Sequence, residues 1–260
     1  MTRLGRYEIE AEIGRGAVGR VHLGHDPRLK RSVALKTYAL PAGLAAEQAS
    51  ELRERFLREA QAAAALSHPG IVTVYDADED RPSGLLFIAM EYVPGRTLRD
   101  ELDTSGPLSL ERACALTAVL AAALDVAHGA GIVHRDIKPA NILLREPDGA
   151  VKLTDFGVAR FSASTLTHTG ATVGSPAYMS PEQVRAEPVD GRSDLFSLAA
   201  VVYEALCGTR PFRGDDVAAL AYSIAHDSPE PLAGRLPGAP PALDAFFARA
   251  LAKLPHERFS

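Results

Sequence analysis

HRDIKPAN, residues 134–141, is the stretch around which the rest of this chain can be placed. It sets an acid, a base and an amide within one turn-rich loop, in Asp136, Lys138 and Asn141. A carboxylate can accept a proton from an alcohol, an ammonium group can neutralise negative charge, and an amide oxygen can ligate a hard cation. The same polar cluster lies between two short apolar runs and also fits a solvated turn. The octamer alone leaves both interpretations open.

A second carboxylate follows a little further along the chain. The triplet Asp155-Phe156-Gly157 begins fourteen residues after Asn141 and comes directly after residues 151–153, which predict a short strand. We expect this strand to deliver Asp155 close to the first loop. The string HRDIKPAN followed by DFG resembles the catalytic and metal-binding loops of the eukaryotic-like (Hanks-type) bacterial serine/threonine protein kinases.

That resemblance implies a role for each polar residue of the two loops. Asp136 would accept or orient the hydroxyl proton of a protein substrate, and Lys138 would stabilise the γ-phosphoryl group of ATP. Asn141 and Asp155 would hold Mg²⁺, or Mn²⁺ in its place. The order Asp-x-Lys-Pro-x-Asn is similar to that of serine/threonine kinases, whereas tyrosine kinases usually lack a lysine there.

The composition is that of an ordinary globular protein. With 260 residues, 47% hydrophobic and 23% charged, the chain can form one large domain or two lobes. The net charge of -5 argues against a nucleic-acid binder. Cys114 and Cys207 each lie in an apolar helical pattern, so we expect two core thiols and no disulfide scaffold. No signal peptide and no run of about 18 apolar residues is present, so we expect no membrane contact from this segment.

A glycine-rich turn near the N-terminus lies between two strand patterns. Residues 7–13 and 21–23 read as strands, and Gly14, Gly16 and Gly19 of the turn form G-x-G-x-x-G. A dinucleotide-binding fingerprint would have to open a helix after its glycines, but here a third strand pattern follows at residues 32–38. The hairpin is therefore the favoured interpretation, with a backbone that can pass close over phosphates.

By resemblance to the kinases, this hairpin and the segment that follows it would bind ATP. Ala17-Val18 at the loop tip departs from the larger residue that the family often has, which would loosen the lid over the γ-phosphate. Met90 would guard the back of the pocket, and the backbone of Glu91 and Val93 would bond adenine. The nucleotide-binding set implied in this way is Ile13, Gly14, Arg15, Gly16, Ala17, Val18, Gly19, Arg20, Val21, Ala34, Lys36, Met90, Glu91, Val93 and Leu143.

Lys36 ends the apolar stretch Val33-Ala34-Leu35 and needs a partner, since an unpaired buried ammonium group is costly. It could also reach the solvent at the edge of the sheet. An amphipathic helix is predicted over residues 47–66, with Phe56 and Ala60 on its apolar face and Glu59 beside that face. The family resemblance implies an ion pair between Lys36 and Glu59 in the catalytic machinery.

The remaining patterns fit an α+β, two-lobed kinase fold. We expect a five-stranded small lobe with one helix over residues 1–92, completed by strands at 71–75 and 85–92 on either side of an acidic loop at 76–84. A larger, mainly helical lobe is expected over 93–260, including a helix from Ser109 to His128. ATP would bind in the cleft between the lobes.

A threonine-rich segment, residues 162–172, reads as an exposed loop. Arg135 directly precedes the catalytic acid and suggests a socket for a phosphate arriving from this loop. By position, Thr167 and Thr169 match the autophosphorylation pair of bacterial kinases.

Three features of the C-terminal part also carry the resemblance. Asp194 would bond the catalytic-loop backbone from beneath, and Arg258 would pair with Glu182 of Ser-Pro-Glu. The helix expected near residues 217–226 resembles the family's substrate- and partner-docking region. The chain ends before the family's last helix, so we expect a kinase domain cut early.

The sequence as a whole predicts a serine/threonine protein kinase that uses MgATP, with proteins as substrates. Two alternatives are a pseudokinase that serves as a nucleotide-binding scaffold and a small-molecule phosphotransferase of kinase-like fold. By analogy with the family, we expect a homodimer formed through the small lobes and a cytoplasmic location. Full-length relatives often carry a transmembrane helix after the kinase domain.

Overall fold

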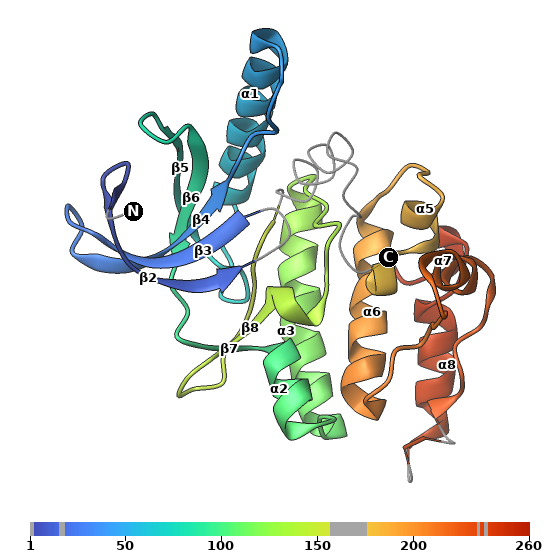
Figure 1. The fold of residues 1–260 in the computed structure, drawn as a ribbon. Coiled ribbons are helices and arrows are strands. Elements are labelled where there is room, and N and C mark those ends of the chain that lie inside the picture. The colour runs from blue at the N-terminus through green and yellow to red at the C-terminus, as the bar shows by residue number, and fades with distance from the viewer. Residues whose placement is uncertain (1–2, 16–18, 157–175, 233–234, 237–238) are drawn as a thin grey trace. The chain divides into compact units, whose positions relative to one another are not determined.

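A computed structural model describes residues 3–15, 19–156, 176–232, 235–236 and 239–260. These residues form two compact units (Figure 1). The first comprises the described residues up to Pro94 together with Asp155 and Phe156, and the second comprises 95–154 and the described residues from Pro176 on. The first boundary between the two units therefore lies between Pro94 and Gly95. The division into lobes at 92/93 stays a prediction.

The first unit is built on an antiparallel sheet in the order β1-β2-β3-β4-β6-β5. Its buried face carries Leu4, Tyr7, Val33, Leu35 and Phe87, with the rings of Tyr7 and Phe87 meeting edge to face. Burial of these apolar side chains is the main term that holds the sheet together. The strands are β1 (Arg3–Leu4), β2 (Tyr7–Arg15), β3 (Gly19–Asp26), β4 (Arg31–Tyr38), β5 (Val74–Asp80) and β6 (Leu85–Glu91).

Two details of this sheet differ from the prediction. The sheet has six strands, because Arg3–Leu4 turns back through Gly5, at φ +55°, to pair with β2. The strand expected at 71–75 is instead β5 at Val74–Asp80. Most of the acidic loop predicted at 76–84 therefore belongs to a strand. Its backbone pairs with the buried strand β6, the next strand in the chain, and this pairing overrides the poor strand propensity of aspartate.

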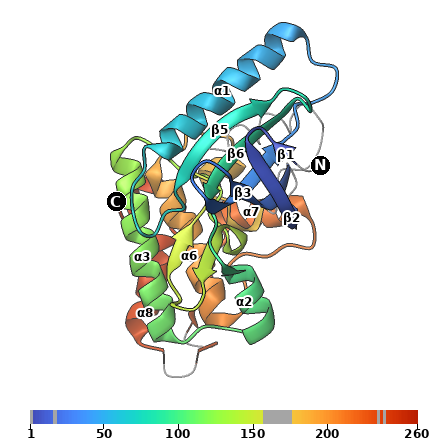
Figure 2. The same cartoon turned by 90° about the vertical axis from the view of Figure 1, so that its left-hand side faces the viewer.

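Among the described residues of this unit, α1 (Ala46–Ala64) is the one long helix, and it confirms the expected amphipathic helix. Phe56, Ala60 and Ala63 form its buried face, and the ring of Phe56 meets that of Tyr38 at 5.3 Å. Figure 2 shows α1 running along β5. This packing fixes the side of α1 that faces the sheet.

The second unit is mainly helical and is centred on α6 (Gly191–Cys207), which is buried along most of its length and packs against α3 and α8 (Figure 1). Ser109 accepts a hydrogen bond from the Arg112 amide and starts α3 at the predicted place. The other elements are β7 (Gly95–Thr97), α2 (Leu98–Ser105), α3 (Leu110–Gly129), η1 (Pro139–Asn141), β8 (Ile142–Arg145), β9 (Val151–Leu153), η2 (Pro176–Tyr178), α5 (Pro181–Val184), α7 (Val217–His226), α8 (Pro241–Ala250) and η4 (Pro255–Glu257).

The prediction of two core thiols is wrong for Cys114, which is exposed on α3, and Cys207 is only partly buried. Cys114 lies outside the apolar side of α3 that carries Leu116, Leu120 and Leu124, all of which are buried. The buried side is the one that carries Ala113, Leu116 and Leu120. Both cysteines are free thiols, as expected.

Among the helices that the structure describes, none is long and apolar enough to cross a membrane.

Candidate active site

The loop at residues 134–138 is held from below by the carboxylate of Asp194 on α6. The amides of His134 and Arg135 donate to Asp194 at 2.8 and 2.7 Å, and His128 from the last turn of α3 donates to the same carboxylate at 2.8 Å. Asp194 is fully buried, and Arg135 has a φ of +69°, which is strained for a residue with a side chain. The expected anchoring role of Asp194 is confirmed, and it fixes the loop in a conformation that the chain would not adopt unaided.

His134 links this loop to the end of β9. Its Nε2–H donates to the carbonyl oxygen of Thr154 at 2.8 Å, while its Nδ1 accepts from the amide of Asp136 at 3.2 Å. The amide of Thr154 donates to the carbonyl of Asn141 at 3.0 Å. The backbone immediately before Asp155 is therefore bonded to both ends of the HRDIKPAN stretch.

Asp136, Lys138 and Asn141 form one hydrogen-bonded group. One carboxylate oxygen of Asp136, Oδ2, receives Lys138 Nζ at 2.7 Å and Asn141 Nδ2 at 3.0 Å, and the same amide group bonds the Asp136 carbonyl at 2.8 Å. The side chain of Asp136 is 43% exposed. Because its Oδ2 already accepts two bonds, Oδ1 is the oxygen left to meet a hydroxyl proton.

The donor atoms of the two predicted metal ligands suit a hard cation. The side-chain NH₂ group of Asn141 donates to the carbonyl and the carboxylate of Asp136. Among the described residues, none donates to the side-chain oxygen of Asn141. Asp155 supplies a carboxylate, and oxygen ligands of these two kinds are those that Mg²⁺ prefers. Among the described residues there is no cluster of three or more His, Cys, Asp or Glu side chains that could hold a metal.

In the first unit, the ion pair of Lys36 differs from the prediction. Lys36 Nζ lies 2.6 Å from the carboxylate of Asp155, and Glu59 accepts from Arg55 at 3.0 Å. Among the described residues the expected Lys36–Glu59 pair is not formed. The physical reason is proximity: Arg55 stands one turn before Glu59 on the same face of α1, and Asp155 offers Lys36 a short charge-assisted bond.

Asp155 has a φ of +71°, a second strained position at the site. Its charge also acts on its surroundings. Burial, and to a lesser degree the Asp155 carboxylate, raise the pKa of Tyr38 well above its ordinary value. Tyr38 therefore stays neutral beside the Lys36–Asp155 pair.

The glycine-rich hairpin is confirmed in β2 and β3, although Gly16, Ala17 and Val18 lie outside the described residues. Gly19 has to be glycine, because a Cβ there would lie 1.8 Å from the Thr37 carbonyl oxygen. The side chains of Arg15 and Arg20 bond Glu12 at 3.1 and 3.2 Å.

The adenine-side residues predicted in the first unit lie on neighbouring strands. Ala34 on β4 pairs with Met90 on β6, and both are buried. Val21 pairs with Lys36, and Glu91 ends β6. Ile13 is 47% exposed on β2, and Gly14 pairs with Val21. Val93 follows β6, and Leu143 lies on β8 of the second unit.

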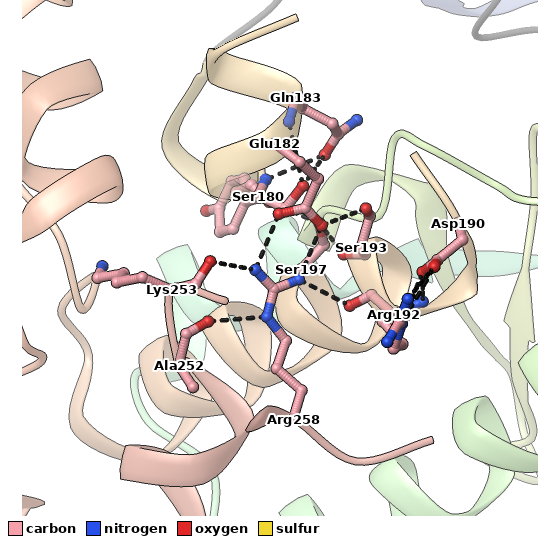
Figure 3. Close-up of polar contacts among 11 residues, drawn as sticks. Ser180, Glu182, Gln183, Asp190, Arg192, Ser193, Ser197, Ala252, Lys253 and Arg258 are labelled. Atoms are coloured by element: carbon pink, nitrogen blue, oxygen red, sulfur yellow. Dashed lines mark hydrogen bonds and ion pairs between the residues drawn. The ribbon is translucent and has the colours of Figure 1, made fainter. Parts of the chain in front are cut away.

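A buried ion pair joins α5 to the C-terminal segment (Figure 3). Arg258 donates to the two oxygens of Glu182 at 2.7 and 2.8 Å, and both side chains are almost fully buried. Arg258 also bonds the carbonyls of Ala252, Arg192 and Lys253, and Ser193 donates to Glu182. Burial opposes ionisation of Glu182, but the bonds from Arg258 and Ser193 outweigh it and hold the pKa of this carboxyl below its usual value. The predicted pair is confirmed.

Comparison with known proteins identifies the family of this chain. The model of the protein kinase domain matches residues 7–260. The chain belongs to the protein kinase family. It is 48% identical over 259 residues to serine/threonine-protein kinase PknB of Mycolicibacterium smegmatis, an alignment that covers 98% of this chain and 41% of that protein. It is 45% identical to the probable serine/threonine-protein kinase SCO3848 of Streptomyces coelicolor, covering 98% of this chain and 38% of that protein. The chain thus spans less than half the length of these relatives.

The kinase fold is supported by solved structures as well. The crystal structure of the Mycobacterium tuberculosis PknI kinase domain aligns with a TM-score of 0.77 at 31% identity, covering 99% of this chain and 91% of that one. Membership of the kinase family implies ATP and a divalent metal ion as cofactors and proteins as substrates.

Two contacts of the kinase loop were not predicted. Gln183 Nε2 donates to the carbonyl of Arg135 at 2.8 Å, and His128 bonds Asp194. Gln183 directly follows Ser-Pro-Glu and His128 precedes HRDIKPAN, but the partners of their side chains are known only from the folded chain. The predicted phosphorylation sites Thr167 and Thr169 lie outside the described residues.

Proposed function

We propose that this kinase domain transfers the γ-phosphoryl group of ATP to serine and threonine hydroxyls of proteins. The observation that carries the proposal is the group formed by Asp136, Lys138 and Asn141, in which one carboxylate oxygen is fixed and the other is left for a hydroxyl. Similarity to bacterial serine/threonine kinases over 98% of the chain supports the same reaction.

Each side chain has a distinct task in this proposal. Asp136 orients the substrate hydroxyl and takes its proton, and Lys138 neutralises charge on the phosphoryl group in flight. Lys36 holds the α- and β-phosphates, and Asn141 and Asp155 bind the metal. Mg²⁺, when bound, neutralises charge on the phosphates. The 2.6 Å contact between Lys36 Nζ and the Asp155 carboxylate supports these assignments.

Two regulatory assignments extend the proposal. Autophosphorylation of Thr167 and Thr169 would supply a phosphate to Arg135, whose backbone is already fixed by Asp194 and Gln183. Helix α7 would contact protein substrates, and it exposes Val217 and Tyr222 at 56% and 64%. The small-lobe homodimer and the cytoplasmic location stay predictions from family analogy.

The test is intact mass before and after incubation with MgATP and a threonine-rich protein, with mapping of the phosphorylated sites. The parent should gain phosphate, and Asp136→Asn and Lys36→Met should not. Asp103→Asn and Lys30→Met are matched controls, because both change exposed residues outside the site and should behave as the parent does.

Two results would contradict the proposal. If the parent, retaining its folded state, transfers no phosphate while nucleotide raises its melting temperature, the domain is a nucleotide-binding scaffold. If phosphate appears only on small molecules, the domain is a small-molecule phosphotransferase. Phosphate found only outside residues 162–172 of active protein would overturn the assignment of Thr167 and Thr169.

A further inference from the structure

Helix α7 is attached to the rest of its unit mainly by its last turns. Ser223, Ile224 and Ala225 are buried, whereas Val217 and Tyr222 are exposed. The helix lies against α5 and η2, which follow the threonine-rich segment in the sequence. A helix with so short a buried face needs other contacts to fix its position.

Two cationic side chains supply such contacts at its C-terminal end. Lys253 Nζ donates to the carbonyl of Ile224 at 2.7 Å, and Arg185 donates to the carbonyl of Ala225 at 2.9 Å. The last carbonyls of a helix have no partner within the helix and carry its negative dipole end, so both cations are well matched to this place. Lys253 follows α8 and Arg185 follows α5, so two separate segments hold the same turn.

Lys253 is unusual because it is partly buried and its ammonium group lies over an aromatic ring. Nζ is 3.8 Å from the centre of the Phe212 ring, and this ring stacks on Phe196 at 5.8 Å. The charged groups that act on it are Asp227 after α7, Arg185, and Arg258, which bonds the Lys253 carbonyl. Burial lowers the pKa of Lys253 to about 8, while Asp227 partly opposes this shift. A lysine in such surroundings is held there by specific contacts, and no step of the phosphoryl transfer uses it.

We propose that Lys253 and Arg185 are positioning residues for the binding of protein substrates, because together they hold the last turn of α7 against α5 and η2. This inference rests on the proposed function, in which α7 contacts the substrate protein. The segment VAALAYSIAH of α7 carries no Asp, Glu, Lys or Arg, so its exposed face suits an uncharged surface of the substrate and depends on correct placement more than on charge attraction.

The test compares Lys253→Met and Arg185→Met with the parent in the full chain, by hydrogen exchange of the α7 amides and by steady-state kinetics. Loss of one bond should speed exchange in residues 217–226 and raise KM for a protein substrate about five- to tenfold. KM for ATP and KM for a short threonine peptide should stay unchanged. Lys253→Arg retains a charged donor and should restore slow exchange, and Lys30→Met, an exposed lysine of the other unit, serves as the control.

The outcomes separate this inference from the proposed function. Unchanged exchange in α7 for both Met variants overturns the positioning role, even if KM changes. Faster exchange with equal effects on the KM of protein and peptide overturns the substrate role. If the parent transfers no phosphate, the proposed function fails, and exchange alone then decides whether Lys253 and Arg185 anchor the helix. If one Met variant does not fold, the other Met variant, which removes the second bond to the same turn, gives the comparison with the parent.

Discussion

Replacement of Arg258 by methionine tests the energetic role of the buried ion pair between α5 and the C-terminal segment. The change removes both bonds to Glu182 and the bonds to the carbonyls of Ala252, Arg192 and Lys253. Glu182 would keep the Ser193 hydroxyl as its remaining side-chain partner among the contacts described. The variant therefore leaves a buried carboxylate without its countercharge.

The size of the effect follows from the burial of both partners. The side chains of Arg258 and Glu182 are 0% and 4% exposed, so solvent cannot replace the lost bonds. Removal of one partner of a buried pair costs about 3–5 kcal/mol. For a chain of this size, that loss lowers the melting temperature by roughly 10 °C.

The assay is thermal and urea unfolding followed by circular dichroism, at pH 7. Arg249→Met is the matched control, since Arg249 is an exposed arginine that only covers the Phe259 ring, and it should change stability by less than about 1 kcal/mol. The double variant Glu182→Met with Arg258→Met should be more stable than Arg258→Met alone, because no charge is left buried. A loss below about 1 kcal/mol for Arg258→Met would refute this account.

Three further predictions concern the same unit. Asp194→Asn replaces one of the two accepting carboxylate oxygens by an NH₂ group, so one of the two loop amides loses its acceptor, and kcat should fall while KM for ATP changes little in steady-state assays. Gly191→Ala puts a Cβ 2.6 Å from the His128 ring, and thermal unfolding should show a loss of about 1–3 kcal/mol. The pKa of Lys253 is lowered from 10.5 to about 8. Between pH 8 and pH 10.5 the lysine side chain is protonated in the unfolded chain and largely deprotonated in the folded chain, so the free energy of unfolding rises with pH. The urea concentration at the midpoint of unfolding should therefore increase over this range in the parent and change less in Lys253→Met.

Local signals in the sequence were enough to determine the motifs and the helices α1, α3 and α7. Ser109 caps α3, Gly208 ends α6 in the left-handed conformation, and α7 occupies the predicted residues 217–226. These features depend on neighbours within a few positions, namely capping side chains, glycine and apolar periodicity. Residue types and spacing in HRDIKPAN and DFG indicated only an acid, a cation and a metal ligand, and the role of each residue was implied by the resemblance to protein kinases.

The tertiary structure decided which distant groups meet. The sequence predicted Glu59 as the partner of Lys36, but the folded chain brings Asp155 to 2.6 Å instead. It also places Cys114 on the surface and draws acidic residues of β5 into the sheet. Each of these outcomes depends on contacts formed in the folded chain, between Lys36 and Asp155 or between β5 and the buried strand β6, where the free energy of pairing or burial outweighs local preference. Partner choice and burial are therefore properties of the folded chain, whereas motif chemistry belongs to the sequence.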